Sequence, residues 1–537
     1  MFDILGEPLF MLASSVVERR PDPRTTSAPG RLDALGIALL ASVLLAFSFI
    51  QSHERIFWGD EIMGNLVLNA GSWAAFLARW RAGIDSSGFW FYVFAKPWEW
   101  IFGPSELSLR LFSATGIATA AGLIWITARR FYTLPVVAAS VGLIFLEINT
   151  LRWQLSNGRC YGVFMAAFAL VLFLIFHGEA ERYRRPSLPF LLVSAVAYDI
   201  LAGSHILGML YAGALLAMQI SLDLRARRPR IPLYVAAVVG IVAIVLFSIP
   251  NIQSTTALGK PVFWTAFPRY LDLLCITDLT DNPVRRLALA LVVMTFIFWR
   301  LHRARATVYW VLLGFLVLDL LLFVLSRFTT SIYVDRYLLP FCFALVLLFA
   351  ELLTQLAEAA VPHARLRRLA PWCLLLICAA TMSYAHPFPL PVLDYTQSLL
   401  NAMPPGLPVV DTDVANFVEM EHYHHGRFNR PFLFPIDPGI TADPGNLGGV
   451  SGFHEMDNFR KLGLDTPDLQ PTDAILSRYP HLLVVTAAVP TTWLAKRILD
   501  THQYAVQDLG PAPGLQPMHL WEAERRSASP ISPAPLR

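Results

Sequence analysis

The chain consists largely of long apolar runs separated by short polar segments. Roughly 17–25 apolar residues in a helix are enough to cross the hydrocarbon core of a bilayer, and eleven runs approach or reach that length. They lie at about 32–52, 107–127, 134–150, 160–177, 188–204, 207–222, 232–250, 284–300, 307–325, 338–357 and 371–387. The pattern predicts a polytopic membrane protein with about eleven transmembrane helices.

Arginine clusters occur at every second crossing of this predicted membrane domain. The clusters are Arg19/Arg20/Arg24, Arg129/Arg130, Arg182/Arg184/Arg185, Arg225/Arg227/Arg228/Arg230, Arg300/Arg303/Arg305 and Arg365/Arg367/Arg368. Because basic residues favour cytoplasmic loops, we expect these clusters and the N-terminus on the cytoplasmic side. The segments 53–106, 151–159, 205–206, 251–283 and 326–337, and all residues after about 388, then lie outside.

The composition supports a membrane protein and excludes two other classes. Charged residues make up 15% of the chain, against about 25% in soluble globular proteins. A net charge of +3 is too small to indicate nucleic-acid binding. The five cysteines have no CxxC spacing, which excludes the usual disulfide framework or zinc site.

Two outer regions have a different character from the apolar runs. In the segment 53–106 we expect an amphipathic helix at 65–80 and a short aromatic segment at 89–102 that lies flat at the membrane surface. After 388 the apolar runs shorten, and strands are expected at 407–410, 431–435, 481–486, 504–509 and 518–522, with helices at 413–424 and 491–501. This alternation predicts a small α/β domain with a largely parallel sheet, in which Thr412 or Asp413 caps the first helix.

These observations predict four parts of the chain. We expect a cytoplasmic tail at 1–30, a transmembrane domain at 31–387 that includes the catalytic outer loop 53–106, a periplasmic α/β domain at 388–525 and a disordered tail at 526–537. No cleavage site follows the first apolar run, which is therefore expected to be a retained anchor.

The first candidates for chemistry are the adjacent carboxylates Asp60 and Glu61, just after the first run. Carboxylates are costly near hydrocarbon, and those found there are usually functional or paired. Adjacent side chains point in different directions, so the two residues are not expected to share a proton. The structural alternative is that Asp60 caps a helix that begins near Glu61.

Arginines on the predicted outer face are the second group of candidates. Arg152, Arg159 and Arg336 lie where the positive-inside rule disfavours them, and guanidinium groups bind phosphate through paired hydrogen bonds. The structural alternatives are a pair between Arg152 and Glu147, a pair between Arg336 and its neighbour Asp335, or contact with lipid headgroups.

Two further features favour a structural role. Asp319 lies in the middle of an apolar run, where an ion path or a buried hydrogen bond to another helix would account for it. The run 419–425 (EMEHYHH) has metal-ligand residue types but no HExxH-like pattern, so a solvated helix end is expected.

Four motifs occur in a consistent order along residues 35–345. They are the acidic pair Asp60–Glu61, the FG-x-SE-x-x-x-R pattern of Phe102, Gly103, Ser105, Glu106 and Arg110, the R-x-Y of Arg159 and Tyr161, and the RY-x-x-P of Arg336, Tyr337 and Pro340. Together they resemble the membrane glycosyltransferases of the GT-C fold of the glycosyltransferase family 39 type, which include protein O-mannosyltransferases and bacterial aminoarabinose transferases. The resemblance implies an all-α transmembrane domain with interfacial helices, followed by an extracytoplasmic α/β domain.

The resemblance also implies an activity and a place in the cell. It implies an inverting transfer of a sugar from a polyprenyl-phosphate carrier to the hydroxyl of a glycan, lipid or protein acceptor, in the bacterial inner membrane. Asp60 would be the general base and Glu61 would orient the acceptor. From their place on the predicted outer face, together with these motifs, we expect the substrate to be bound by Arg152, Arg159, Tyr161, His205, Lys260, Arg336 and Tyr337.

Two alternatives remain open at the level of the sequence. Asp60 and Glu61 are hard oxygen ligands that would also suit a divalent metal ion, although no further acidic pair accompanies them. A transporter or lipid-handling protein without transferase chemistry is the competing class. It predicts several polar residues at mid-bilayer depth, where Asp319 is the main candidate.

Overall fold

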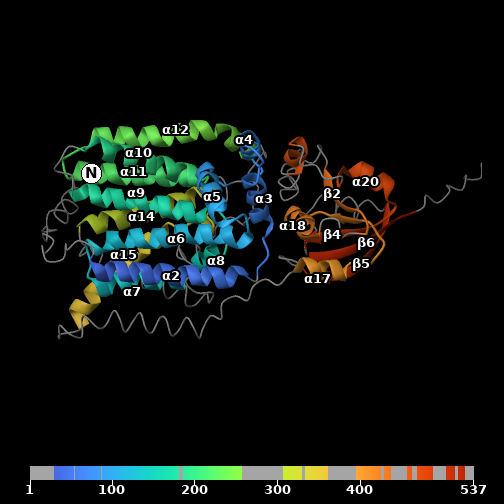
Figure 1. The fold of residues 1–537 in the computed structure, drawn as a ribbon, viewed down its shortest axis with the longest axis horizontal. Coiled ribbons are helices and arrows are strands. Elements are labelled where there is room, and N and C mark those ends of the chain that lie inside the picture. Colours follow the sequence, from blue (N-terminus) through green and yellow to red (C-terminus); the bar gives the residue numbers. More distant parts are fainter. Residues whose placement is uncertain are drawn as a thin grey trace, which may run out of the picture. The chain divides into compact units, whose positions relative to one another are not determined.

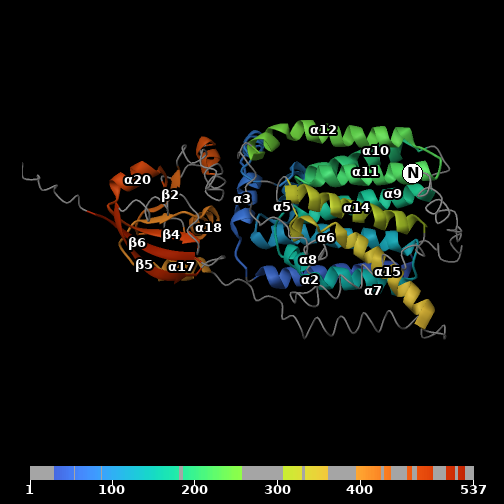
Figure 2. The same cartoon turned by 180° about the vertical axis from the view of Figure 1, so that it is seen from behind.

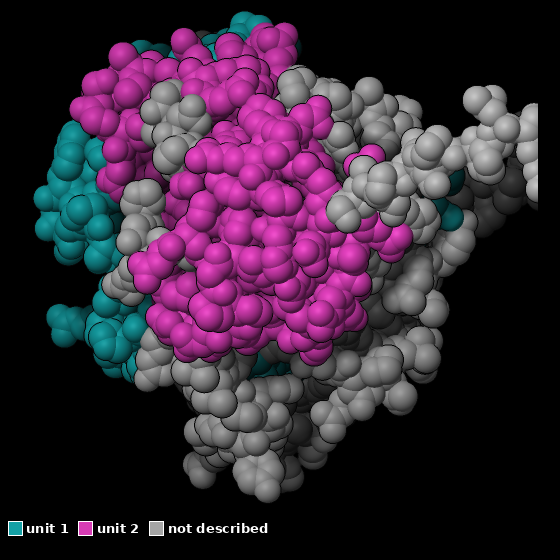
Figure 3. All heavy atoms as spheres, turned by 90° about the vertical axis from the view of Figure 1, so that its right-hand side faces the viewer, with its two compact units in different colours: residues 1–53, 87–248, 265–390 teal, residues 54–86, 249–264, 391–537 magenta. Residues whose placement is uncertain are grey.

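The computed structural model divides the chain into two compact units, which are coloured separately in Figure 3. The described residues are 30–53, 55–85, 87–180, 186–256, 306–328, 333–360, 395–424, 429–436, 456–462, 468–487, 503–513 and 518–526. The first unit comprises residues 1–53, 87–248 and 265–390, and the second comprises residues 54–86, 249–264 and 391–537. The segment 54–86 therefore packs within the same unit as the C-terminal part of the chain. The boundaries given above for the four parts of the chain remain a prediction.

Long helices that run side by side form the first unit (Figure 1 and Figure 2). Its described elements are α2 (Arg31–His53), α5 (Phe89–Phe102), α6 (Glu106–Arg129), α7 (Leu134–Glu147), α8 (Asn149–Leu155), α9 (Tyr161–Ala180), α10 (Leu188–Ser204), α11 (Gly208–Arg225), most of α12 (Ile231–Thr256), α14 (Ala306–Phe328), the 3-10 turn η3 (Asp335–Tyr337) and α15 (Phe341–Ala360). Nine of the eleven predicted runs coincide with these helices. The runs at 284–300 and 371–387 lie outside the described residues.

The apolar helices identify a multi-pass membrane protein. Among the described residues, four helices have the length and hydropathy to cross a bilayer, namely α2, α6, α12 and α14, with mean hydropathies from 1.6 to 2.6. Shorter apolar helices accompany them at Leu134–Glu147, Tyr161–His177, Leu188–Ser204 and Phe341–Gln355.

Small residues bring α6 and α9 into close contact. A Cβ atom added at Gly162 of α9 would lie 2.0 Å from the carbonyl oxygen of Ser113, and one added at Gly116 of α6 would lie 2.4 Å from the carbonyl carbon of Gly162. Such contacts between small residues let helix backbones approach in the membrane. The hydroxyl of Ser113 also donates a hydrogen bond to the carbonyl oxygen of Arg159 at 3.0 Å, so the contact holds the segment before α9 against α6.

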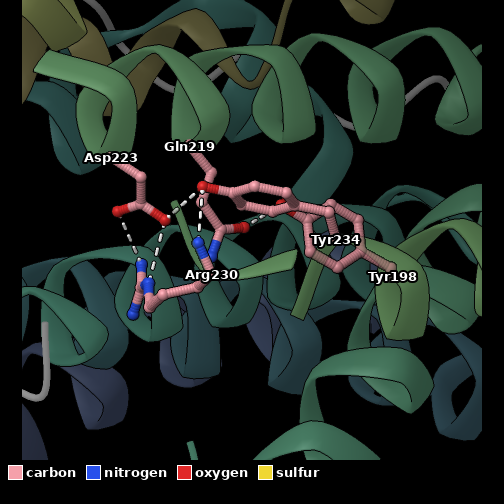
Figure 4. Close-up of polar contacts among 5 residues, drawn as sticks. All are labelled: Tyr198, Gln219, Asp223, Arg230 and Tyr234. Atoms are coloured by element: carbon pink, nitrogen blue, oxygen red, sulfur yellow. Dashed lines mark hydrogen bonds and ion pairs between the residues drawn. The ribbon is translucent and has the colours of Figure 1, made fainter. Parts of the chain in front are cut away.

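A buried polar network joins α10, α11 and α12 (Figure 4). The guanidinium of Arg230 binds the Asp223 carboxylate through two hydrogen bonds, Nε to Oδ2 at 2.9 Å and Nη2 to Oδ1 at 3.0 Å. The hydroxyl of Tyr234 donates to the same carboxylate at 2.7 Å, and the hydroxyl of Tyr198 donates to Gln219 at 2.8 Å. Within the predicted basic cluster 225–230, Arg230 therefore serves to fix the turn between α11 and α12.

The FG-x-SE-x-x-x-R pattern has a structural explanation in the junction between α5 and α6. Gly103 ends α5 with a φ of 86°, a conformation that favours glycine. Ser105 caps α6 by accepting a hydrogen bond from the backbone N–H of Ser108 at 3.1 Å. Arg110 is fully buried and donates to the carbonyl oxygen of Ser52, at the end of α2, at 3.2 Å. The predicted aromatic segment is helical as α5, and its place at the membrane surface remains a prediction.

A mixed sheet, drawn in orange to red in Figure 1, organises the second unit. Within the described residues it has six strands in the order β3-β2-β1-β4-β6-β5. The strands are β1 (Val409–Asp411), β2 (Phe432–Ile436), β3 (Leu469–Pro471), β4 (His481–Ala487), β5 (Tyr504–Ala512) and β6 (Met518–Arg525). Pairing is parallel from β3 to β4, whereas β6 is antiparallel to both β4 and β5. The prediction of a largely parallel sheet was wrong for the β4-β6-β5 side of the sheet, where both pairings are antiparallel. The five residues between β5 and β6 are too few for a parallel crossover.

Short helices complete the second unit. They are α3 (Gly59–Leu68), α4 (Trp73–Arg81), α17 (Tyr395–Ala402), α18 (Val414–His424) and α20 (Thr472–Arg478). The single helix predicted at 65–80 is in fact two, because the chain breaks after α3 and Ser72 caps α4 by accepting from the N–H of Ala75 at 3.1 Å. Of the two residues predicted to cap α18, Thr412 and Asp413, it is Asp413 that does so. Its side chain accepts a hydrogen bond from the N–H of Asn416 at 2.9 Å. The predicted helix at 491–501 lies outside the described residues.

Candidate active site

The acidic pair lies in the first turn of α3, in the second unit. Glu61 is fully buried, and its carboxylate accepts a hydrogen bond from the backbone N–H of Trp58 at 3.3 Å. Asp60 is half-buried and follows the first helical residue, so Asp60 is not the cap of α3. Acidic side chains in a first turn are stabilised by the helix dipole. The two carboxylates therefore have different surroundings, and Glu61 has a clear role in holding the turn.

A third carboxylate, which the sequence did not single out as catalytic, lies beside this turn. Glu419 of α18 is only 1% exposed, and its Oε1 accepts a hydrogen bond from the backbone N–H of Gly59 at 2.7 Å. Burial raises the pKa of Glu419 to about 8; the negative charges of Glu61 and Asp60 add to this shift, while the Gly59 N–H and the charge of Arg55 oppose it. The expectation of a solvated helix end at 419–425 was wrong for Glu419 and His424, which are buried, whereas His422 is exposed.

A cluster of basic and aromatic side chains forms in the first unit, at the end of the helices where α9 and α11 begin. The ring of His205 lies 5.6 Å from the ring of Tyr161 and 5.2 Å from that of Tyr337. The guanidinium of Arg336 lies over the Tyr337 ring, 5.3 Å from its centroid. Arg336 and Arg159 both interact electrostatically with the Tyr161 hydroxyl. These five predicted substrate-binding residues are therefore neighbours, although they come from three separate parts of the sequence.

Backbone contacts fix two of the three segments that supply this cluster. His205 forms a β-bridge with Ser87, and its Nδ1 accepts a hydrogen bond from the N–H of Leu207 at 3.1 Å. The hydroxyl of Tyr211 donates to the carbonyl oxygen of Tyr337 at 2.8 Å. The cluster therefore rests on a helix-to-helix turn and on η3, both of which are held by hydrogen bonds to neighbouring elements.

Arg152 lies in α8, next to η3. Thr150 of the same helix donates a hydrogen bond to Asp335 Oδ2 at 2.9 Å, and the other oxygen of Asp335 accepts from the backbone N–H of Arg336 at 2.7 Å. Arg152 is buried and interacts electrostatically with Glu147. This is the structural alternative that the sequence suggested for Arg152. This interaction gives Arg152 a structural role.

The remaining predicted candidates are only partly placed. Lys260 lies outside the described residues. Within the described part of the chain, no group of three or more His, Cys, Asp or Glu side chains is arranged to hold a metal ion. Asp319 is buried in α14, and its Oδ1 accepts a hydrogen bond from the hydroxyl of Tyr333 at 2.8 Å. This bond accounts for Asp319, although the donor lies in the segment after α14 and not on another helix.

Comparison with known proteins identifies the fold. No family profile matches the chain, and no curated protein matches it in sequence. The apo crystal structure of ArnT from Cupriavidus metallidurans matches with a TM-score of 0.51 and 15% identity, over 91% of this chain and 98% of that one. The crystal structure of the same protein bound to undecaprenyl phosphate matches with a TM-score of 0.49 and 14% identity, over 90% and 97% of the two chains. ArnT is an aminoarabinose transferase of the GT-C fold, and the match to its apo structure confirms the predicted fold.

Proposed function

We propose that this protein is an inverting membrane glycosyltransferase that transfers a sugar from a polyprenyl-phosphate carrier to an acceptor hydroxyl. The observation that carries the proposal is the cluster of Arg159, Tyr161, His205, Arg336 and Tyr337 at one end of a membrane-embedded helical unit. A cationic, aromatic-lined site at the end of membrane helices suits a ligand with a lipid tail, a phosphate and a sugar. The shared fold and the binding of undecaprenyl phosphate by ArnT from Cupriavidus metallidurans give further support.

The arginine clusters support a location for this reaction. With the clusters on the cytoplasmic side, the His205 turn and η3 lie at the outer face, because both are at the opposite ends of their helices. We therefore place the protein in a bacterial inner membrane with its N-terminus cytoplasmic and the C-terminal α/β domain periplasmic. The acceptor is then a glycan, lipid or protein of the periplasmic side.

In the proposed mechanism, Asp60 takes the proton of the acceptor hydroxyl while its oxygen attacks the anomeric carbon of the donor sugar. The new bond forms between that oxygen and the anomeric carbon. The bond between the anomeric carbon and the phosphate oxygen breaks, and the electron pair leaves with the polyprenyl phosphate. The sugar passes through an oxocarbenium-like transition state and its anomeric configuration inverts.

The basic residues would stabilise the charge that develops on the leaving phosphate. Arg336 and Arg159 are assigned this role first, and Arg152 contributes to the same positive potential. Guanidinium groups present paired N–H donors to phosphate, and they act more strongly where water is partly excluded. Tyr161, His205 and Tyr337 line the phosphate and sugar, and Lys260 is assigned to the substrate from its place in the sequence alone. Glu61 orients the acceptor through the turn that it holds.

Donor turnover tests the proposal. The purified chain is reconstituted in lipid with polyprenyl-phosphate sugars and an envelope extract, and the loss of sugar-lipid is followed for the wild type, Asp60→Asn and Arg336→Ala. Asp473→Asn, another acid in a first helical turn of the second unit, and Arg228→Ala, at the other end of the first unit, are the matched controls.

The expected result is turnover that disappears in Asp60→Asn while donor binding is kept, and weakened donor binding in Arg336→Ala. Both control variants should behave as the wild type does. Full activity of Asp60→Asn would contradict its assignment as the base. An inactive wild type with all donors tested would contradict the transferase function.

A further inference from the structure

One face of α18 contacts the chain immediately before the acidic pair. Ala415, Glu419 and Tyr423 are spaced four residues apart, so they lie along one side of the helix. The hydroxyl of Tyr423 accepts a hydrogen bond from the backbone N–H of Phe57 at 2.6 Å. Glu419 accepts from the N–H of Gly59, as described above. The third residue, Ala415, packs directly against Gly59.

The contact between Ala415 and Gly59 leaves little room for a side chain at position 59. A Cβ atom added at Gly59 would lie 3.0 Å from both the Cα and the Cβ of Ala415. Because one of these is a backbone atom at the start of α18, the clash could not be relieved by rotating a flexible side chain. The close approach is therefore specified by glycine at one position and a small residue at the other.

Three consecutive backbone N–H groups that precede Asp60 are held by side chains. The N–H of Phe57 donates to Tyr423, that of Trp58 donates to Glu61, and that of Gly59 donates to Glu419. These groups lie at the start of α3, where the first N–H groups of a helix have no partner within the helix itself. Two of the three acceptors come from α18, so α18 determines the path of the backbone that leads into Asp60.

Glu419 is itself held in place from the other side. Its second oxygen, Oε2, is hydrogen-bonded to the hydroxyl of Tyr395 of α17, and both residues are buried. The charged groups that face Glu419 are Arg55, before α3, and Asp60 and Glu61 in its first turn. A neutral carboxyl group fits this environment, because it accepts from Gly59 through one oxygen and pairs with Tyr395 through the other without adding a third negative charge.

We infer that Glu419 is a positioning residue for the proposed general base, and that α18 with Tyr423 sets the place of Asp60 in the reaction. The inference rests on the proposed function of Asp60 and adds a role for the C-terminal part of the chain. The α/β domain then supports catalysis directly, in addition to any recruitment of acceptors. Glu419 acts through the backbone of Gly59 and need not contact the substrate.

The inference distinguishes between two substitutions at the same position. In the wild type the Tyr395 hydroxyl donates to Glu419 Oε2. Glu419→Gln cannot ionise and keeps an oxygen that accepts from Gly59. The Tyr395 hydroxyl must turn so that its oxygen accepts from the new amide N–H group, and the glutamine then stands in for the neutral carboxyl group. Glu419→Ala removes both hydrogen bonds and leaves a cavity. A misplacement of a catalytic group by about 1 Å can lower the rate about 100-fold, so kcat should fall about 10- to 100-fold in Glu419→Ala. The KM for the donor should change less than about threefold, because the donor phosphate is bound by other residues.

A pH profile provides a readout that a purely structural contact would not affect. Since the pKa of Glu419 is raised to about 8, the wild type gains a negative charge next to Asp60 and Glu61 as the pH rises through that value. The repulsion should loosen the turn and lower kcat on the alkaline side. Glu419→Gln should match the wild type at pH 7 and should lack this alkaline decline.

The experiment uses the full chain in lipid and two independent measurements. The first is kcat and the donor KM between pH 6 and pH 9.5, and the second is amide hydrogen exchange of the peptide that covers Gly59 to Ile62. The variants are Glu419→Gln, Glu419→Ala and Tyr423→Phe, and Glu421→Gln of the same helix is the matched control. Faster exchange and a lower kcat in Glu419→Ala, with rescue by glutamine, are expected.

The outcomes separate this inference from the proposed function. Unchanged exchange in Glu419→Ala overturns the inference whether or not the protein turns over donor. Faster exchange with unchanged kcat also overturns it, because the contact is then structural only. An inactive wild type whose exchange responds to Glu419→Ala shows that the contact exists but that the transferase proposal has failed. If kcat still declines at alkaline pH in Glu419→Gln, another group is responsible for the decline. That result would overturn the inference that the charge of Glu419 affects the position of Asp60.

Discussion

The imidazole of His205 lies 5.2 Å from the ring of Tyr337, although 132 residues separate them in the sequence. The Nδ1 atom of His205 accepts the N–H of Leu207, so in the neutral ring the proton is on Nε2. The turn between α10 and α11 thereby places an N–H donor next to the aromatic rings of Tyr161 and Tyr337. In the proposed reaction this donor binds the phosphate or the sugar of the carrier lipid.

Substitution of His205 by phenylalanine tests this role. The change keeps the ring contacts with Tyr161, Phe164 and Tyr337 but removes the N–H group. The loss of one hydrogen bond to a charged group costs about 1.5 kcal/mol or more, so kcat/KM for the donor should fall roughly tenfold. Steady-state kinetics in lipid would measure it. The control is His177→Phe, which alters a stacked histidine in the last turn of α9. Equal values of kcat/KM for His205→Phe and His177→Phe would contradict the prediction.

Gly162 should be one of the least replaceable residues of the membrane unit. A Cβ atom at this position would lie 2.0 Å from the carbonyl oxygen of Ser113, so Gly162→Ala must separate α6 from α9. We expect a destabilisation of about 2 kcal/mol or more and a lower melting temperature in detergent. Gly213→Ala in α11 has nothing within 4 Å of the new Cβ atom and should be neutral or slightly stabilising. Equal melting temperatures for Gly162→Ala and Gly213→Ala would contradict the close packing of α6 against α9.

The stability of the second unit should depend on pH through Glu419. The pKa of its carboxyl group is about 8 in the folded chain, above the ordinary value of 4.5. Between these values the unfolded chain has lost the proton that the folded chain keeps, so the stability of the wild type falls as the pH rises from about 4.5 to about 8. The loss is complete above the folded pKa. Glu419→Gln cannot ionise and should not show this decrease.

The measurement is the unfolding midpoint of wild type and Glu419→Gln at pH 5 and at pH 9. We expect similar midpoints at pH 5 and a more stable variant at pH 9, by up to about 4 kcal/mol. Glu421→Gln should follow the wild type at both values. If the difference in stability between Glu419→Gln and the wild type were the same at pH 5 and at pH 9, the Glu419 carboxyl group would not be protonated at neutral pH.

Substitution of Asp319 separates the transferase from a transporter. Its carboxylate accepts a hydrogen bond from Tyr333, and an asparagine oxygen can accept the same bond. We therefore expect Asp319→Asn to keep donor turnover within about twofold, since the hydrogen bond from Tyr333 is retained. Turnover assays in lipid, with proton flux followed by a pH-sensitive dye, would measure both activities. Proton flux in the wild type that is absent from Asp319→Asn would instead support an ion path.

Local sequence patterns were sufficient for most of the membrane unit. The apolar runs at 32–52 and 107–127 coincide with α2 and α6, because the length of an apolar run sets the length of a membrane helix. The break between α3 and α4 was missed even though Gly71 and Ser72 are ordinary signals for a turn and a helix cap. Strand β3 has only three residues and includes Pro471, so it has no periodicity to detect.

The candidate site could be predicted only in part. The residues Arg159, Tyr161, His205, Arg336 and Tyr337 were singled out by their predicted side of the membrane, and the structure brings them together. The contact between Glu419 and Gly59 joins residues that are 360 positions apart, and no local pattern predicts such a pairing. A face of α18 formed by Ala415, Glu419 and Tyr423 was visible in the sequence, but nothing in the sequence indicated its partner.

The pairing of residues 57–59 with α18 has a consequence for the synthesis of the protein. A ribosome that adds about 5–20 residues per second needs roughly 20–70 s to proceed from Gly59 to Glu419, a separation of 360 residues. During that time the nascent turn around Asp60 lacks the two hydrogen-bond acceptors that α18 supplies. The turn at residues 57–59 is therefore made early in synthesis and acquires its partners only after α18 has been made. A chain that ends before α18 lacks both of these hydrogen-bond acceptors.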